Sequence, residues 1–382
     1  MSRQDLSFAR DEFAARLGRL RGRMQGRAIE LLVLDDIEAM AYVSGYGVSE
    51  TLWRACAVPI AAPPFLMVRQ LDLPPARERS WLEDIVGFRD WDDPVAFFAA
   101  ELGRRGLARR RIGLDFRSSS MPVARFDQLR RLLPGADLVD FGAGIWDLRI
   151  RKSAAELGHM RKAAAIADAA MAAAVQAVRP GGSQRDVAAA AASTYIALGA
   201  DDGLVGPLTS GTDWDSLHGH LHDDALERGA VVHVELVPRV RDYSARIMRS
   251  VIVGRPTDEQ EDVAWQLVAL QDRQIAALVP GARAREVDAI LRRPMLERGL
   301  RPSYDNITGY TLGAYPYPTL KISDFHRIFT PAADWTVEAG MTLHMYTSAR
   351  GLAFSETVLV TEAGPERLTR TERRLFSTEP ES

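Results

Sequence analysis

The N-terminal part of the chain alternates between amphipathic and compact apolar segments. Residues 8–25 have the periodicity of a helix with one apolar face. Residues 124–141 predict a second helix, a glycine stop and a strand. Short apolar runs typical of strands are RAIELLVLDD, RACAVPIAA, PFLMV and RIGLDF. Strands that alternate with helices predict an α/β domain over residues 1–148.

A second domain is predicted over residues 149–382. Ser153 and Glu156 form a capping box at the start of a long alanine-rich helix. Two pairs of segments then repeat one another, RPGGSQRDV with VPGARAREV and VVHVELV with MTLHMYT. Two similar halves predict a domain with pseudo-two-fold symmetry, whose strands converge at its centre. The fold class expected for the whole chain is therefore α+β.

The composition is that of an ordinary globular protein. The 382 residues carry a net charge of −3, which gives no electrostatic reason to expect a nucleic acid or an anionic membrane as partner. The single cysteine, Cys56, excludes an internal disulfide and a thiolate metal cluster. The N-terminal residues lack the apolar core of a signal peptide. We therefore expect a cytoplasmic protein.

The segment HGHLHDD, residues 218–224, groups three of the seven histidines. It partly resembles the HxHxDH signature of the metallo-β-lactamase fold, but Ala225 follows Asp224 where that signature has a histidine. The alternatives are a zinc site and a surface loop with solvated histidines, and the missing ligand favours the loop.

Motifs of the second domain occur in one characteristic order. They read RIRKSAAEL, SGTD…LHGH, RGAVVHVEL, DYSARIMRS, TGYTLGAYPY, VEAGMTLHMYT and SETVLVTEAG. The series resembles RxxKSxxE, SGxN…H, GDxVxxDxG, GYxxDxTRT, GHGIGxxxHE, EPGMxxxxEP and ExTxxVTxxG of the pita-bread-fold family. That family includes methionine aminopeptidase, aminopeptidase P, prolidase and creatinase. The resemblance covers essentially the whole chain and implies a creatinase-like N-terminal domain before a pita-bread catalytic domain.

The same resemblance implies a changed set of metal ligands. Metal-dependent members hold two ions with Asp, Asp, His, Glu and Glu, and the matching positions here are Glu235, Arg246, Tyr310, Tyr346 and Glu356. A guanidinium only donates hydrogen bonds, and neutral phenols are poor ligands of hard ions. We therefore expect no metal and no other cofactor. Arg246 is expected to pair with Glu235 and Glu356, or to bind a substrate carboxylate or phosphate.

His218 matches, by its spacing from Gly211, the acid/base histidine of metal-free creatinase. An imidazole can take a proton from water and pass it to a leaving nitrogen near neutral pH. The alternative is a half-exposed loop histidine that is hydrogen-bonded to an aspartate. The catalytic residues that the resemblance implies are His218, Glu235 and Glu356. Creatinase's second substrate-gripping glutamate matches Met248, which argues against creatine as the substrate.

Other side chains are expected to bind the substrate. The tyrosines match positions that line the family's site, and Arg54 matches, within one position, an arginine that reaches the partner subunit's site in creatinase. The full expected set is Arg246, Tyr243, Tyr310, Tyr317, Tyr346, Trp53 and Arg54. If Arg54 has that role, the protein is a homodimer with its active site near the interface.

These observations together predict a metal-independent enzyme that hydrolyses a non-peptide C–N bond of a small polar molecule. Creatinase and ectoine hydrolase are the models for this reaction, and a metallo-aminopeptidase is not expected. Two alternatives stay open: a lyase, cyclase or isomerase that uses the same pocket, and a non-catalytic binding protein.

Overall fold

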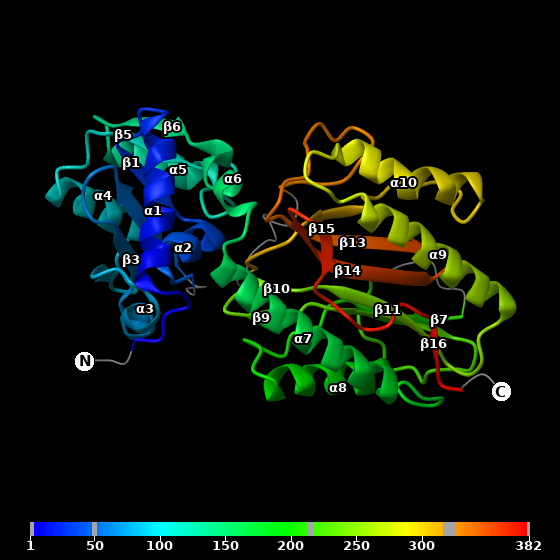
Figure 1. Ribbon diagram of the computed structural model, residues 1–382. Helices are drawn as coiled ribbons and strands as arrows, with labels where there is room; N and C mark the ends of the chain where they lie inside the picture. Colours follow the sequence, from blue (N-terminus) through cyan, green and yellow to red (C-terminus); the bar gives the residue numbers. More distant parts are fainter. Residues whose placement is uncertain (1–3, 48–51, 213–216, 316–325, 380–382) are drawn as a thin grey trace. The chain divides into compact units, whose positions relative to one another are not determined.

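The computed structural model describes residues 4–47, 52–212, 217–315 and 326–379 (Figure 1). These residues fall into two compact units, one up to Arg149 and one from Ile150 onward. Tyr317, an expected site residue, lies outside the described residues. Within the described residues, no helix combines the length and the apolar character needed to cross a membrane.

The first unit is a mixed α/β domain around a six-stranded sheet of order β4-β3-β2-β1-β5-β6. Strand β1 pairs antiparallel with β2 and parallel with β5. Apolar side chains of β1, among them Leu31 and Val33, pack with Phe65 and Phe98 in the core. The elements are α1 (Arg10–Gln25), β1 (Leu31–Leu34), α2 (Ile37–Ser44), β2 (Ala55–Pro59), β3 (Phe65–Arg69), α3 (Leu73–Arg79), β4 (Asp84–Phe88), α4 (Pro94–Arg104), β5 (Arg111–Leu114), α5 (Val123–Leu132), β6 (Asp137–Asp140) and α6 (Trp146–Arg149). The α/β architecture expected from the sequence is confirmed.

The second unit contains an eight-stranded sheet whose main path is β12-β13-β14-β11-β8-β7; β15 pairs with β14 and β16 with β11. The strands are β7 (Leu208–Gly211), β8 (Val231–Leu236), β11 (Ile247–Ile252), β12 (Gly309–Thr311), β13 (Thr342–Ala349), β14 (Leu352–Thr361), β15 (Gly364–Arg367) and β16 (Phe376–Ser377). A separate two-stranded ribbon joins β9 (Arg239–Val240) to β10 (Tyr243–Ser244). The helices are α7 (Ala154–Ala177), α8 (Gln184–Ala197), α9 (Asp258–Ala276) and α10 (Ala284–Glu297).

The expected internal repeat is confirmed by matching helix starts. A capping box of Ser153 and Glu156 begins α7, as the sequence predicts. Before α8 and α10 the chain turns through Gly181 and Gly281, with φ of 76° and 89°, a left-handed conformation that glycine adopts without a Cβ clash. Each of these glycines donates its N–H to a carbonyl of a distant segment, Gly181 to Leu226 and Gly281 to Val337, both at 2.9 Å.

The two faces of the eight-stranded sheet differ in what they carry. The helices cover one face, which we call the helix face. There α7 and α8 pack on Val232 and Val234 of β8, and the second helix pair packs on alternate residues of β13 and β14 such as Met345 and Phe354. Since neighbouring residues of a strand point to opposite faces, the residues between these face the other side. That side, which we call the polar face, carries most of the expected site residues.

Candidate functional site

The polar face brings together positions that lie far apart in the sequence. Paired residues in adjacent strands point to the same face. Glu235 of β8 pairs with Met248 of β11, and Met248 pairs with Ser355 of β14. Ser355 in turn pairs with Tyr346 of β13. The register of the sheet therefore aligns glutamate, methionine, serine and tyrosine across four adjacent strands.

Arg246 lies directly before β11 and two residues before Met248, so it points to the same face. Its Nε is 3.7 Å from Oε1 of Glu235, and both side chains are almost completely buried. Its Nη1 donates a hydrogen bond to the hydroxyl of Tyr310 from β12. The guanidinium thus contacts side chains of β8 and β12, although three strands of the sheet, β13, β14 and β11, lie between them.

Tyr310 and Tyr346 belong to an aromatic cluster on this face. Their ring centroids are 6.2 Å apart, and the His344 ring lies 5.0 Å from Tyr310 and 5.5 Å from Tyr346. The side-chain amide of Asn306 donates a hydrogen bond of 3.1 Å to the Tyr346 hydroxyl. Burial raises the pKa of Tyr346 to about 12, and the nearby charge of Glu235 acts in the same direction. Tyr346 is therefore a neutral phenol at physiological pH.

Several buried polar groups of the polar face lack protein partners. Within the described residues, neither ring nitrogen of His233 has a hydrogen-bond partner, and neither has Oγ1 of its strand neighbour Thr209 or Oγ of Ser355. Burial lowers the pKa of His233 to about 3, with a smaller contribution from the charge of His218. Buried polar groups are normally hydrogen-bonded. A cluster of exceptions on one face is typical of a surface that receives polar groups of a ligand or water.

His218 lies on the loop at the β7 edge of the sheet. It is exposed, whereas the preceding Leu217 packs against Met248, Tyr310 and Tyr346. The charge of His218 adds to the effect of burial in lowering the pKa of His233. The loop thus places the His218 backbone beside the polar face, with an imidazole that solvent can reach.

The other histidines of this loop are solvated. His222 is exposed, and its Nδ1 lies 4.0 Å from a carboxylate oxygen of Asp224. His220 is exposed too, and its ring is 4.5 Å from that of His222. The surface-loop interpretation of HGHLHDD fits this arrangement better than a zinc site does.

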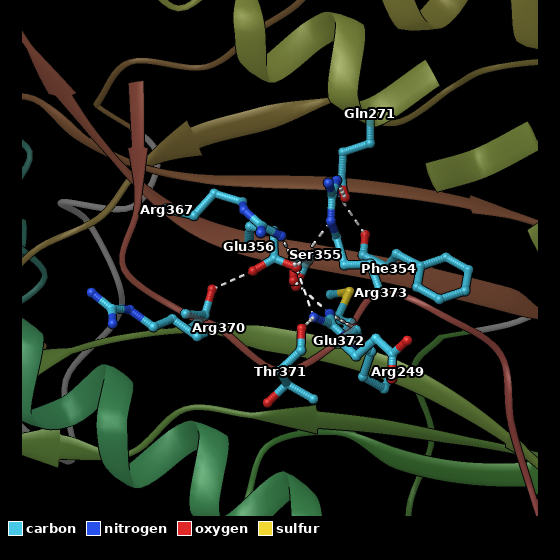
Figure 2. Close-up of polar contacts among 12 residues, drawn as sticks. Arg249, Gln271, Phe354, Ser355, Glu356, Arg367, Arg370, Thr371, Glu372 and Arg373 are labelled. Atoms are coloured by element: carbon cyan, nitrogen blue, oxygen red, sulfur yellow. Dashed lines mark hydrogen bonds and ion pairs between the residues drawn. The ribbon is translucent and has the colours of Figure 1, made fainter. Parts of the chain in front are cut away.

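Glu356 does not belong to the polar face, which corrects its expected place beside Glu235. Its neighbour Ser355 faces the polar side, so Glu356 points to the helix face. There its carboxylate accepts a hydrogen bond of 2.7 Å from Nη2 of Arg249 (Figure 2). It accepts another of 2.5 Å from the Thr369 hydroxyl. Arg373 and Arg367 lie 3.8 Å and 4.0 Å away. The expected ion pair with Arg246 is thus replaced by one with Arg249.

A one-residue shift explains this error. Counted back from Thr357, the pattern ExTxxVTxxG places its glutamate at Ser355 rather than at Glu356. A shift of one position in a strand moves a side chain to the opposite face of the sheet. The sequence therefore contained the signal for Ser355. It also contained Arg249, which occupies the arginine position of GYxxDxTRT.

Three further expected residues lie elsewhere. The Tyr243 hydroxyl donates a 2.7 Å hydrogen bond to Oε1 of Glu156, at the start of α7. Trp53 is buried in the first unit, where its indole N–H donates to Asp35 at 3.0 Å. Arg54 is buried in the same unit, and burial lowers its pKa against the opposing effect of Asp35. The reach of Arg54 into a partner's site stays a prediction.

Two family models match the chain. The Creatinase/Prolidase N-terminal domain matches residues 16–151. Metallopeptidase family M24 matches residues 158–362, which is more than half of the 382 residues. The chain belongs to metallopeptidase family M24. The expected pita-bread, creatinase-like family is thereby confirmed.

Relatives of this M24 chain match it over most of its length. A Xaa-Pro dipeptidase of Pyrococcus horikoshii is 27% identical over 313 residues, which cover 81% of this chain and 85% of that protein. An ectoine hydrolase of Halomonas elongata is 25% identical and is covered completely, with 98% of this chain. The crystal structure of the prolidase from Pyrococcus horikoshii OT3 superposes with a TM-score of 0.79 at 23% identity, over 95% of this chain and 100% of that one. The structural match shows the same two-domain M24 fold.

These relatives overturn the function expected from the sequence. The expected metal-independent hydrolysis of a non-peptide C–N bond is wrong, together with its lyase, cyclase, isomerase and non-catalytic alternatives, and so is the exclusion of a metallopeptidase. Xaa-Pro dipeptidases of Pyrococcus horikoshii and Pyrococcus furiosus match at 27% and 30% identity, whereas the ectoine hydrolase of Halomonas elongata matches at 25%. The error arose because the altered positions were given more weight than the similarity of the whole chain.

The described residues at the M24 ligand positions do not fit two metal ions. With the corrected register these positions hold Glu235, Arg246, Tyr310, Tyr346 and Ser355. One of them is a carboxylate, and the guanidinium beside it repels a cation and offers no lone pair. In the part of the chain that the structure describes, no group of three or more His, Cys, Asp or Glu side chains could hold a metal ion. No step of the reaction is therefore assigned to a metal.

Proposed function

We propose that this chain is a hydrolase that cleaves the peptide bond of a dipeptide at the polar face. The observation that carries the proposal is that all five corrected M24 positions lie on that one face, around the buried Glu235 and Arg246 pair. Further support comes from the Xaa-Pro dipeptidase of Pyrococcus horikoshii, which matches over both domains.

The groups on this face can serve the chemistry of hydrolysis. Water must lose a proton as its oxygen bonds to the peptide carbon, and the leaving nitrogen must gain one as the C–N bond breaks. In this proposal His218, exposed at the β7 edge, moves that proton. Arg246 and the Tyr310 hydroxyl are hydrogen-bond donors for negative charge, including that on the oxygen of the tetrahedral intermediate. Glu235 holds the guanidinium in place.

The test is a panel of dipeptides that includes several Xaa-Pro members. Release of the C-terminal amino acid is measured by chromatography, after chelation and again with added manganese, cobalt or zinc ions. We expect at least one dipeptide to be cleaved, and Glu235→Gln to slow its cleavage at least about tenfold. The matched control is Glu366→Gln, which removes the carboxylate of an exposed pair with Arg161 in the same unit and should leave the rate unchanged.

Two results would overturn the proposal. One is the absence of cleavage of every dipeptide in the panel under all metal conditions. The other is an identical cleavage rate in Glu235→Gln and in the parent protein, which would place the reaction elsewhere.

The proposal includes a homodimer that works in the cytoplasm. The support comes from the creatinase-like N-terminal domain, in which Arg54 matches an arginine that reaches a partner subunit, and from the single, buried Cys56. Light scattering on the purified protein tests the dimer, and a monomer at micromolar concentration would contradict it.

A further inference from the structure

We infer that His233 and Thr209 form a subsite of the polar face that binds an uncharged hydrogen-bonding side chain of the substrate, a hydroxyl or an amide. This inference rests on the proposed function, because it names the kind of dipeptide that the same site prefers. Neither residue is one of the five corrected M24 positions. The inference therefore concerns the choice among dipeptides and not the cleavage step itself.

The first observation is the placement of polar residues in strand β8. The strand reads VVHVEL, and its two polar side chains, His233 and Glu235, lie two residues apart and so point to the same face. Val232 and Val234 point the other way, into the core beneath α7 and α8. His233 is therefore a second polar group on the polar face, about 7 Å along the strand from Glu235.

The second observation is that the strand register places polar side chains on both sides of His233. Thr209 of β7 and Ser250 of β11 are its cross-strand partners, and all three residues are almost completely buried. The Ser250 hydroxyl already accepts a hydrogen bond of 2.9 Å from the N–H of Ala353. Cross-strand partners on one face have Cβ atoms about 5 Å apart. A single ligand group can thus contact His233 and Thr209 together.

The third observation is that these two residues leave their hydrogen-bonding groups unused. Among the residues that the structure describes, none forms a hydrogen bond with either ring nitrogen of His233 or with Oγ1 of Thr209. A buried polar group without a partner destabilises the folded protein. Two such groups side by side, in strands that are otherwise well packed, are explained if a ligand supplies the missing partners.

The chemistry of the two groups defines the ligand. A neutral imidazole has one N–H donor and one acceptor nitrogen, and a hydroxyl both donates and accepts. They are complementary to an uncharged group that also donates and accepts, such as the hydroxyl of threonine or the amide of asparagine. An ionised side chain would lack a counter-charge at this subsite. An apolar side chain would leave both protein groups unpaired.

The experiment compares dipeptides that differ in one group of nearly equal shape. Threonine and valine form one such pair, and asparagine and leucine form the other. Each is placed at either position of the dipeptide, next to alanine or proline. The kcat/KM is measured by release of the C-terminal amino acid, and dissociation constants are measured by calorimetry on the full chain. At one position we expect the threonine and asparagine members to be favoured at least about tenfold, because a site built to hydrogen-bond rejects an analogue without that group.

Variants then assign this preference to the subsite. Thr209→Val and His233→Leu should abolish it, chiefly by slowing the cleavage of the threonine and asparagine members. Both should keep or raise the urea midpoint, because they remove buried polar groups that have no protein partner. Since threonine and valine have nearly the same shape, Thr209→Val keeps the test decisive even if His233→Leu does not fold.

The matched control is Thr347→Val in β13. Thr347 is also completely buried, and no described residue bonds to its hydroxyl. It points to the helix face, however, where its strand partner Phe354 packs in the core. Thr347→Val should therefore keep the preference, and its loss in this control would overturn the inference.

The remaining outcomes separate this inference from the proposed function. If no dipeptide is cleaved but calorimetry shows the preference and its loss in Thr209→Val, the proposed function fails and the inference holds. If dipeptides are cleaved without the preference, the inference fails and the function holds. An equal loss for all dipeptides in Thr209→Val would place the contact on the peptide backbone, and it also overturns the inference. Absence of cleavage and binding of every dipeptide overturns both.

Discussion

The second unit contains two buried glutamate–arginine pairs on opposite faces of one sheet, and they differ in how completely they are satisfied. On the helix face, Glu356 and Arg249 are both fully buried and lie 2.7 Å apart. On the polar face, Glu235 and Arg246 lie 3.7 Å apart. The same two side-chain types at similar burial therefore form a closed contact on one face and an open one on the other.

In the closed pair, all three side-chain nitrogens of Arg249 donate hydrogen bonds. Besides Glu356, Arg249 donates to the carbonyls of Met248, Ser355, Thr371 and Glu372 (Figure 2). Two of these carbonyls belong to the C-terminal segment, which Asp168 of α7 also binds through the main chain of Thr371. The pair thus holds the C-terminal segment that contains Thr371 and Glu372 against the sheet.

The comparison teaches that burial of a charged pair does not by itself indicate function. A pair whose hydrogen-bonding capacity is used up by the protein stabilises the fold. A buried carboxylate that receives no hydrogen bond from the described residues, such as that of Glu235, keeps capacity for a ligand. This criterion favours Glu235 over Glu356 as a group that meets a ligand, whereas the sequence analysis expected both glutamates to be catalytic.

Removal of the closed pair should have the largest effect. Glu356→Gln leaves Arg249 buried without its counter-charge, and we expect a loss of about 3 to 5 kcal/mol in the free energy of unfolding, measured with urea. Glu366→Gln, in the exposed pair with Arg161, should cost less than about 1 kcal/mol. Glu235→Gln should cost clearly less than Glu356→Gln, because no residue that the structure describes donates a hydrogen bond to the Glu235 carboxylate. Equal losses for these two variants would break the comparison.

Replacement of the loop histidine should affect activity without affecting stability. If His218 moves the proton, His218→Ala should lower kcat/KM for a cleaved dipeptide by at least about 100-fold, the usual lower range for acid/base groups. The exposed side chain contributes little packing, so the urea midpoint should stay the same. His222→Ala on the same loop is the matched control. A rate within a few-fold of the parent would remove this role from His218.

Acid should lower the free energy of unfolding of the protein through His233, which lies on the polar face. Burial lowers the pKa of His233 from 6.5 to about 3 in the folded protein. Below pH 6.5 the unfolded chain therefore takes up a proton that the folded chain does not. Stability from this group is complete above pH 6.5 and falls by about 2 kcal/mol by pH 5. Urea unfolding at both pH values measures this loss. The loss should disappear in His233→Gln and persist in His222→Gln, and a loss that persists in His233→Gln would contradict the assignment.

The smallest effect is expected at Tyr243, whose hydroxyl is already bonded to Glu156. Tyr243→Phe removes one donor from that carboxylate, which still accepts from the Ser153 N–H, and should cost about 1 to 2 kcal/mol of stability. The KM for a dipeptide should stay unchanged, since this hydroxyl is used by the protein itself. A raised KM with unchanged stability would instead return Tyr243 to the substrate-binding set expected from the sequence.

The sequence by itself determined the family, the two-domain α+β fold and the internal repeat. These follow from local patterns: apolar periodicity, the capping box at Ser153, and ordered motifs that need no knowledge of distant contacts. It also identified Glu235, Arg246, Tyr310 and Tyr346 as a set, because each was matched within its own short motif. The substrate class was mispredicted, since departures at a few positions outweighed the similarity of the whole chain.

Only the tertiary structure decided which of these residues meet. A strand exposes successive side chains to opposite faces, so the choice between Ser355 and Glu356 depends on strand register. The partner of Glu356 is Arg249, 107 positions away along the chain, and only the pairing of β11 with β14 brings them together. The number of hydrogen bonds that a buried charge receives depends on every element packed around it. No local sequence pattern specifies those contacts.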